Sequence, residues 1–188
     1  ERRWQAEASL AGPLAAPVLD ARLTSPEAGG AAFEARASLA PFAAWPIAAL
    51  EARMRDLDLA ALRKDAPQTR LSGQARVETN GLDRPMTARI ELTNALAGRW
   101  DQGRAPVAAV DLELVGQADR RSRLGFKRFD IRLSANAGRI GGSGEWNDGN
   151  AQLDLTLAAV RPALLDARAP AMTLSGTLAV QATGLPDR

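Results

Sequence analysis

The sequence predicts an all-β protein, an elongated and curved antiparallel β-sheet meander with one or two very short helices. Three observations favour this fold class. Apolar and polar residues alternate with a period of two, short turn signals separate the alternating segments, and glycines interrupt one segment where a sheet could coil. The chain is 46% apolar and 24% charged, so it has enough apolar surface to fold.

The clearest strand is residues 71–79, where Leu71, Ala75 and Val77 lie on one side and polar residues lie on the other. Five later segments alternate in the same way. Their apolar residues are Met86, Ala88, Ile90 and Leu92; Val110, Leu112 and Leu114; Phe129, Ile131 and Leu133; Leu153, Leu155 and Leu157; and Leu174, Leu178 and Val180. Weaker alternation predicts strands near residues 4–10, 18–24, 31–39 and 50–59. One wet face and one dry face is the antiparallel pattern.

Turn signals join these strands into a meander. They are Pro26 to Gly30, Asn80-Gly81, Gly98 to Gly103 and Asn147 to Gly149. Residues 139–146 contain three glycines and place Ile140 and Trp146 on one side, which predicts either a coiled strand or a loop. Residues 60–65 and 161–168 break the alternation and predict one or two helical turns each.

An internal repeat suggests an array of stacked units. The phrases LSGQARVETNG (71–81) and LSGTLAVQATG (174–184) align without a gap, and each follows a Leu-Asp-Leu phrase, at 57–59 and at 153–155, and a short helical stretch. We expect one repetitive segment over residues 1–188, with repeat-like units at about 31–81 and 123–184.

Composition argues against several classes of function. The chain has no cysteine or histidine, which excludes thiolate chemistry and imidazole metal sites or bases. The net charge of +2 carries no basic patch of the kind that nucleic acid needs. Because the serines have no histidine beside them, we expect no enzyme, no cofactor and no metal site.

The aspartates and glutamates in Asp111-x-Glu113 and Asp56-x-Asp58 are expected to be solvated charges that face arginines across strands. Trp100 is expected to anchor a glycine-rich turn. No stretch approaches the roughly 18 apolar residues of a membrane span. The start at Glu1, without an initiator Met, predicts a piece of a longer protein whose anchor or signal lies elsewhere.

Three phrases resemble a known family when they are taken in order. They are Leu96 to Val107, which contains Trp-Asp-x-Gly-Arg, then Gly141-Gly-Ser-Gly-Glu-Trp146, then Leu153-Asp-Leu-Thr-Leu157. Over roughly residues 30–188 the chain is similar to the TamB/AsmA-like family, the translocation and assembly module proteins. Members of this family are anchored in the inner membrane and lie in the periplasm of the Gram-negative cell envelope.

The resemblance implies a β-taco, a curved sheet whose open apolar groove shields phospholipid between the inner and outer membranes in outer-membrane biogenesis. The apolar residues named above from Leu71 to Val180, with Ile140 and Trp146, would line that groove. The resemblance also implies an outer-membrane barrel partner of the Omp85 type, similar to TamA, which would be reached through other parts of the protein. No catalytic residue is implied.

Other interpretations stay open. Alternation alone favours a closed sandwich or a small barrel, because most one-faced sheets pack on a partner layer. The chain could also be a scaffold that offers its sheet edges to outer-membrane protein strands by β-augmentation, or a passive solenoid or sandwich spacer of an envelope protein. A groove predicts an open apolar face, a scaffold predicts a free edge strand, and a spacer predicts a filled core.

Overall fold

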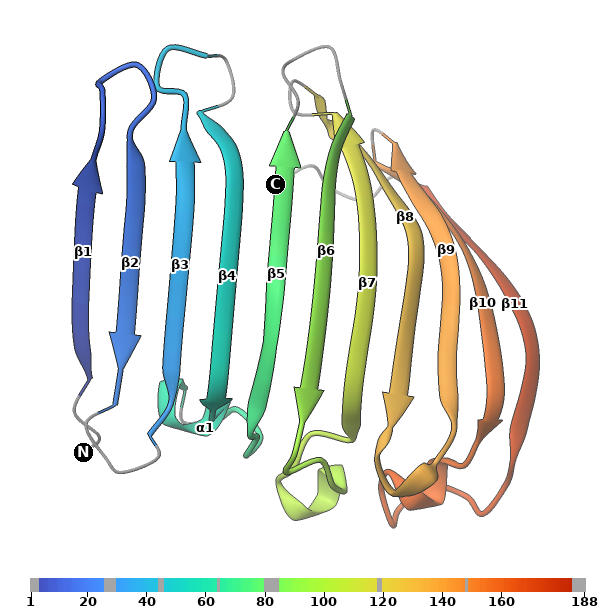
Figure 1. Cartoon of the computed structure of the whole chain (residues 1–188). Helices are drawn as coiled ribbons and strands as arrows, with labels where there is room; N and C mark the ends of the chain where they lie inside the picture. Colours follow the sequence, from blue (N-terminus) through green and yellow to red (C-terminus); the bar gives the residue numbers. More distant parts are fainter. Residues whose placement is uncertain are drawn as a thin grey trace.

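A single open sheet contains most of the regular structure. The computed structural model describes residues 4–25, 30–43, 46–63, 65–79, 85–117, 120–147 and 149–183. Eleven antiparallel strands lie side by side in chain order, so each pairs only with its sequence neighbours (Figure 1). They are β1 (Gln5–Ala11), β2 (Val18–Thr24), β3 (Ala32–Leu39), β4 (Ile47–Leu57), β5 (Leu71–Thr79), β6 (Pro85–Asn94), β7 (Val107–Gln117), β8 (Arg120–Leu133), β9 (Arg139–Asn147), β10 (Asn150–Val160) and β11 (Leu174–Ala182).

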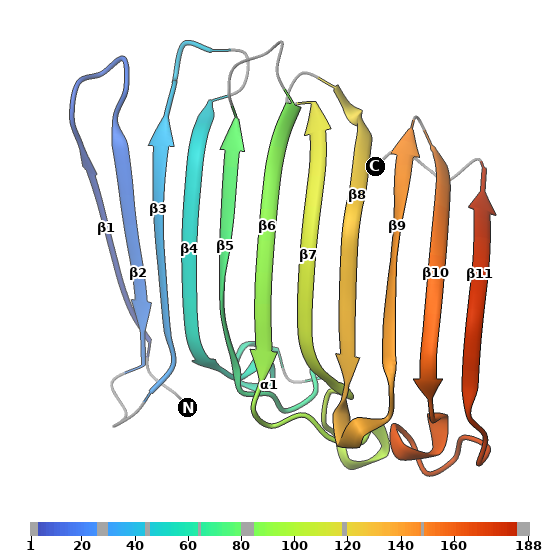
Figure 2. The same ribbon diagram turned by 45° about the vertical axis from the view of Figure 1, so that its right-hand side comes forward.

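The predicted all-β meander is confirmed, and the alternative of a closed barrel is wrong because β1 and β11 are the two ends of one open sheet. The sheet is curved. In Figure 1, β1–β6 are spread apart while β9–β11 crowd together, and after the 45° turn of Figure 2 β9–β11 spread and β1 and β2 crowd together. The glycine-rich residues 139–147 form strand β9, so the loop interpretation of this segment is also wrong.

Three irregularities keep apolar residues on one face where simple alternation would turn them away. In β8, Phe126 and Phe129 pair with Leu114 and Leu112, so the extra residue between them is accommodated in a bulge. In β4 a bulge at Asp56, whose φ is 51°, separates Met54 from Leu57. In β10 a bulge at Ala159, whose φ is 50°, separates Leu157 from Val160.

The last two bulges are equivalent in the repeat. The Asp56 N–H donates to Ser72 Oγ at 3.0 Å, and the Ala159 N–H donates to Ser175 Oγ at 3.0 Å, so each bulge is held by the serine of a Leu-Ser-Gly phrase. Leu57 pairs with Leu71, whereas Val160 pairs with Leu174. The position equivalent to Leu57 is therefore Val160, not the first leucine of the later Leu-Asp-Leu phrase.

Short helical turns follow β4, β6, β8 and β10, and all lie at one end of the sheet (Figure 1). They are α1 (Leu59–Leu62), η1 (Trp100–Gln102), η2 (Ser134–Asn136) and η3 (Pro162–Leu164). The helices expected at 60–65 and 161–168 are thus present but shorter. We call the connections that contain them the helical rim, residues 58–63, 65–70, 95–106, 134–138 and 161–173. Asp58 is the N-cap of α1, and its side chain accepts a hydrogen bond from the Ala60 N–H.

Hydrogen bonds join the helical rim across the ends of several strands. The Gln68 N–H donates to the Gly103 carbonyl at 2.8 Å, and Ser134 Oγ donates to the Gly98 carbonyl at 3.3 Å. The Trp100 N–H donates to the Leu165 carbonyl at 2.8 Å, which links the connection after β6 to the connection after β10. These bonds hold successive connections together as one edge of the molecule.

Candidate functional site: an uncovered apolar sheet face

One face of the sheet is apolar without interruption from β1 to β11. The pairing registers align a row of side chains across all eleven strands. The row is Ala8, Ala21, Ala35, Ala52, Ala75, Ile90, Leu112, Phe129, Gly142, Leu155 and Leu178. Rows on either side of it are also apolar, because side chains alternate along each strand. We call this surface the apolar face.

Every residue expected to line a groove lies on the apolar face. The register places the residues from Leu71 to Val180 on one side of the sheet, and Ile140 and Trp146 join them opposite Ile131 and Leu124 of β8. Most of these side chains are half-buried. Toward the edge they become more exposed, with Leu178 at 51%.

The sequence-based list of lining residues omitted part of the face. Leu19, Leu23, Phe33, Leu50 and Met54 extend it across β2–β4. Their alternation was visible in the sequence, but the strands there are rich in alanine and give a weaker signal. The list also omitted Leu124 and Phe126, for a different reason. The bulge in β8 inserts one residue, so strict alternation counted from Phe129 does not place Leu124 and Phe126 on the apolar face.

Surface area separates an open face from a filled core. The accessible surface is 12322 Å². A compact monomer of 19.9 kDa is expected to expose about 8,700 Å². No large side chain among the described residues is fully buried. The described residues therefore form a sheet whose apolar face has no second layer packed on it.

Among the described residues, a cluster of buried apolar side chains covers the apolar face at the helical rim. Leu133, Ala137 and Val160 are buried there, and Ile131, Ile140, Leu157, Leu164 and Leu165 pack against them. Leu164 and Leu165 come from η3 and its end, so the connection after β10 closes the face at this end. Trp100 is 54% exposed, and its backbone N–H joins its turn to the connection after β10.

The opposite face carries charges that pair across strands. Arg22 and Glu34 are 2.5 Å apart, and Arg76 and Glu51 are 2.8 Å apart. Asp111 pairs with Arg128 at 3.4 Å, as was expected for the first of the two carboxylate phrases. We call this surface the charged face.

Glu113 occupies a denser cluster of charges on this face. Lys127 donates a hydrogen bond to it at 3.2 Å, and Arg89 lies 3.5 Å away. These cations hold the pKa of Glu113 below its ordinary value. The arrangement fits a solvated ladder of ion pairs.

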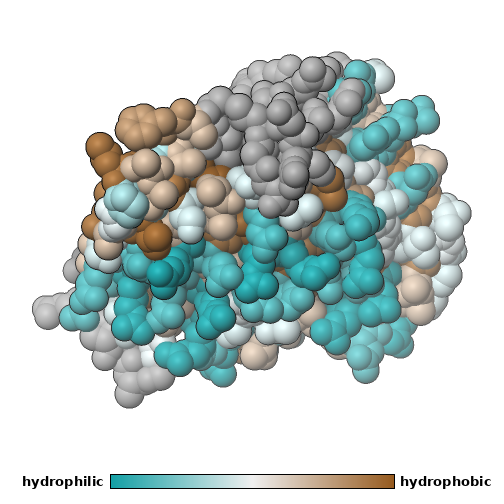
Figure 3. Space-filling model, turned by 45° about the horizontal axis from the view of Figure 1, so that its top comes forward, coloured by the Kyte–Doolittle hydropathy of each residue, from teal (hydrophilic) through white to brown (hydrophobic). Residues whose placement is uncertain are grey.

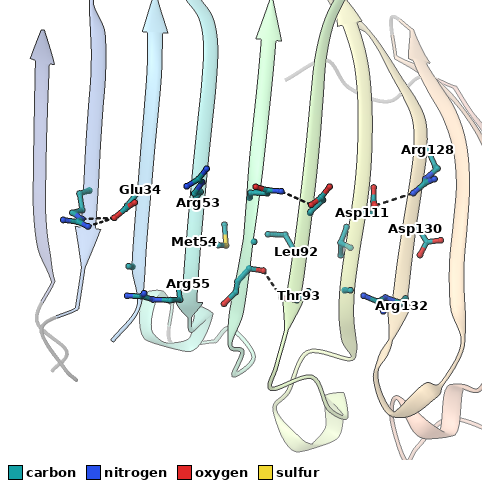
Figure 4. A pocket seen from close by; sticks show the side chains of 18 of the residues that line it. Glu34, Arg53, Met54, Arg55, Leu92, Thr93, Asp111, Arg128, Asp130 and Arg132 are labelled. Carbon is teal, nitrogen blue, oxygen red and sulfur yellow. Dashed lines mark hydrogen bonds and ion pairs between the residues drawn. The ribbon is translucent and has the colours of Figure 1, made fainter. Parts of the chain in front are cut away.

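A depression of about 1060 Å³ crosses the charged face from β2 to β9 (Figure 4). Six arginines and four carboxylates line it: Arg22, Arg53, Arg55, Arg128, Arg132, Arg139, Glu34, Glu91, Asp111 and Asp130. Of the expected lining residues only Leu92 and Val110 reach it. This depression is therefore distinct from the expected apolar groove, and Arg22, Arg128 and Arg139 pair across the strands with Glu34, Asp111 and Asp130.

The helical rim holds a second group of charges. Arg99 pairs with Asp101 at 2.5 Å, and Arg168 pairs with Asp166 at 2.6 Å. The hydrogen bonds from Arg168, through its side chain and its backbone N–H, lower the pKa of Asp166 to about 2. Asp101 Oδ1 also accepts from the Ala167 N–H at 3.3 Å, so its carboxylate helps to join two connections of the rim.

None of the described helices has the length and the apolar composition to span a bilayer. Comparisons of the chain with protein-family models, with curated proteins and with solved structures found no match.

Proposed function

We propose that this chain is a section of a bridge-like lipid-transfer protein that shields phospholipid acyl chains between the inner and outer membranes of a Gram-negative envelope. This is the function of the TamB/AsmA-like family that the sequence resembles. One observation supports it above the others: the apolar row is unbroken across eleven strands, and no second layer of described residues covers it.

An uncovered apolar face suits lipid tails because of the cost of exposing them to water. Each methylene that leaves an apolar environment costs about 0.8 kcal/mol, so a whole tail faces a barrier on the order of 10 kcal/mol. Aliphatic side chains offer contact without hydrogen bonds, so a tail would slide rather than stop. The head group would stay in water, and eleven strands would provide a path on the order of 50 Å.

Native mass spectrometry of the purified chain, followed by lipid extraction, tests the proposal. We expect co-purified phospholipid with the parent chain, and its loss in Ile90→Asp, Leu112→Asp and Ile131→Asp, because each change puts a charge in the middle of the apolar face. These central positions carry a risk of misfolding. Leu178→Asp is a safer variant, since that side chain is 51% exposed before the change.

The matched control comes from neighbouring residues of one strand. Leu155 lies on the apolar face opposite Leu178, whereas Thr156 is exposed on the charged face. Leu155→Asp should abolish phospholipid binding, and Thr156→Asp should retain it. A parent chain that carries no phospholipid and refuses phospholipid added from micelles would refute the proposal.

A second candidate function rests on the sheet edges. Within the described ranges, β1 pairs with β2 alone and β11 pairs with β10 alone, and the side chains of β1 are exposed throughout. Free backbone donors and acceptors at such edges can bind an extended chain by β-augmentation. Binding of a fluorescent outer-membrane protein β-strand peptide, lost on Ser9→Pro in β1 but kept in Leu155→Asp, would favour this scaffold function over lipid shielding.

A further inference from the structure

Two neighbouring hairpins have unusual connections. The loop between β1 and β2 reads Gly12-Pro-Leu-Ala-Ala-Pro-Val18, and the loop between β3 and β4 reads Ala40-Pro-Phe-Ala-Ala-Trp-Pro-Ile47. Both place proline on each side of a large apolar residue and two alanines. No charged residue occurs in residues 8–19 or 37–50. Each stretch comprises one loop and the strand ends beside it, so both loops lack charge although loops usually lie in water.

Both loops hold their large apolar residue out into solvent. Leu14 is a central residue of a turn in which the Ala16 N–H donates to the Pro13 carbonyl at 3.0 Å. Phe42 is likewise a central residue of a turn, in which the Ala43 N–H donates to the Ala40 carbonyl at 2.9 Å. The side chains of Leu14 and Phe42 are each 78% exposed.

The loops form one end of the molecule, opposite the helical rim. The Leu39 N–H donates to the Pro17 carbonyl at 2.9 Å, which fixes the second loop beside the first. Figure 3, which turns this end toward the viewer, shows hydrophobic atoms gathered on its left side, over β1–β4. We call the segments around Leu14 and Phe42 the apolar tips.

We propose that the apolar tips insert into the interface of a lipid bilayer. Large apolar side chains at the surface mark sites of contact with a membrane or with another protein. Two convex tips on separate hairpins favour a fluid bilayer, because a protein partner would need two matching hollows. The later connections at residues 80–84 and 118–119 contain Asp83, Arg84 and Asp119, so this composition belongs to the β1–β4 hairpins alone.

Because the apolar tips carry no charge, a bilayer of neutral lipid should be sufficient for their insertion. Without lysine or arginine in the tips, insertion depends on burial of Leu14 and Phe42 and not on attraction to anionic lipid. Binding to vesicles of pure phosphatidylcholine should therefore occur, and added salt should leave it unchanged. Binding that requires anionic lipid would overturn the inference, since the arginines of the charged face would then explain it.

Site-specific labelling can show which end enters the bilayer. Because the chain has no cysteine, single-cysteine variants Leu14→Cys, Phe42→Cys and Leu62→Cys can each carry one environment-sensitive fluorophore. Leu62 is the matched control, since it is 53% exposed at the opposite end of the sheet. Phosphatidylcholine vesicles should shift the emission to the blue at positions 14 and 42 and leave position 62 unchanged. An equal response at position 62 would overturn the proposal.

Vesicle flotation measures the energetic contribution of the tips. The double variant Leu14→Asp/Phe42→Asp should partition into phosphatidylcholine vesicles at least about tenfold more weakly, and Leu62→Asp should match the parent chain. Both changed side chains lie in solvent, so the fold should persist, which circular dichroism checks. If the parent chain does not float, or if the tips instead hold two chains together in sedimentation, the inference is wrong.

The inference is independent of the proposed function. The double variant should still carry phospholipid in native mass spectrometry, because the apolar face is unchanged. A parent chain that floats with vesicles but carries no phospholipid would support membrane insertion by the apolar tips and refute lipid shielding. A parent chain that carries phospholipid but does not float would support lipid shielding and refute insertion by the tips.

Discussion

At the scale of single residues, glycines on the apolar face decide how closely strands approach. A Cβ atom on Gly142 would overlap the carbonyl oxygen of Asp154 on β10, and one on Gly144 would overlap that of Gln152. Gly141, which precedes Gly142 in β9, differs, since a Cβ there would lie 3.4 Å from the nearest atom, the Phe129 carbonyl oxygen. Glycine is therefore needed at the alternate positions Gly142 and Gly144 of β9, because a side chain there would overlap the backbone of β10.

We expect Gly142→Ala to lower the free energy of unfolding by about 1–3 kcal/mol, because the new methyl group must push β9 and β10 apart. The neighbouring Gly141→Ala should change it by no more than about 0.5 kcal/mol. Urea unfolding of the two variants measures both values. Equal losses would mean that glycine acts through backbone freedom and not through close approach.

The helical rim predicts a pH dependence. The pKa of Asp166 falls from 3.8 to about 2 because Arg168 donates hydrogen bonds to its carboxylate. A lowered folded-state pKa stabilises the fold above the unfolded pKa, and this contribution is lost as the pH falls from about 4 toward 2. Asp166→Asn should lower the melting temperature near neutral pH, and the difference from the parent chain should shrink across that range.

Two controls sharpen this test. High salt should reduce the difference, since the Debye length is about 3 Å at 1 M and Asp166 is not deeply buried. Asp154→Asn, on an exposed position of β10, should change the melting temperature less. A difference for Asp166→Asn that stays constant at every pH would show that the asparagine perturbs the rim for another reason.

At the scale of elements, the paired bulges of the repeat explain how long strands reach the helical rim without turning their apolar residues outward. Each bulge places one residue near φ = +50° and uses a serine from the next strand to satisfy its N–H. The extra residue shifts the alternation by one, so Met54 and Leu57 share a face, as do Leu157 and Val160.

Removing the serine hydroxyl should weaken this arrangement. Ser72→Ala should lower the free energy of unfolding by about 1 kcal/mol, because the N–H of Asp56 loses its acceptor. Ser175→Ala should cost less, since its hydrogen bond is exposed. Ser143→Ala, on an exposed position of β9, serves as the control in the same chemical unfolding series. A Ser72→Ala variant as stable as the control would show that the bulge does not depend on the serine.

Alternation in the sequence was enough to predict the strands and the apolar side of each one from Leu71 onward, because period two is a local property. It failed where a bulge intervenes, as between Phe126 and Phe129, since an inserted residue looks like the end of a strand. It also could not decide between an open face and a closed sandwich. That choice depends on contacts between distant segments, and Leu112 would alternate in the same way in either fold.

At the scale of the whole molecule, the apolar and charged faces put different demands on the environment. The charged face is satisfied in water, where pairs such as Arg22–Glu34 and Arg76–Glu51 are exposed. The chain exposes about 3,600 Å² more than a compact monomer of its mass would. Soluble monomers tolerate apolar patches of only about 300–600 Å². The apolar face therefore requires a covering, whether by lipid, by another part of the protein or by a second chain.

This demand gives a prediction for the chain stripped of lipid. We expect it to self-associate as its concentration rises, because two apolar faces can bury each other. A single-chain lysophospholipid should return it to a monomer by covering the face instead. Sedimentation velocity, with and without lysophospholipid, measures both states. Leu112→Asp should stay monomeric without lipid, whereas Thr156→Asp on the charged face should associate like the parent chain. A delipidated parent chain that remains monomeric and binds no apolar dye would mean that the face is covered in solution, and the lipid-shielding proposal would then lose its main support.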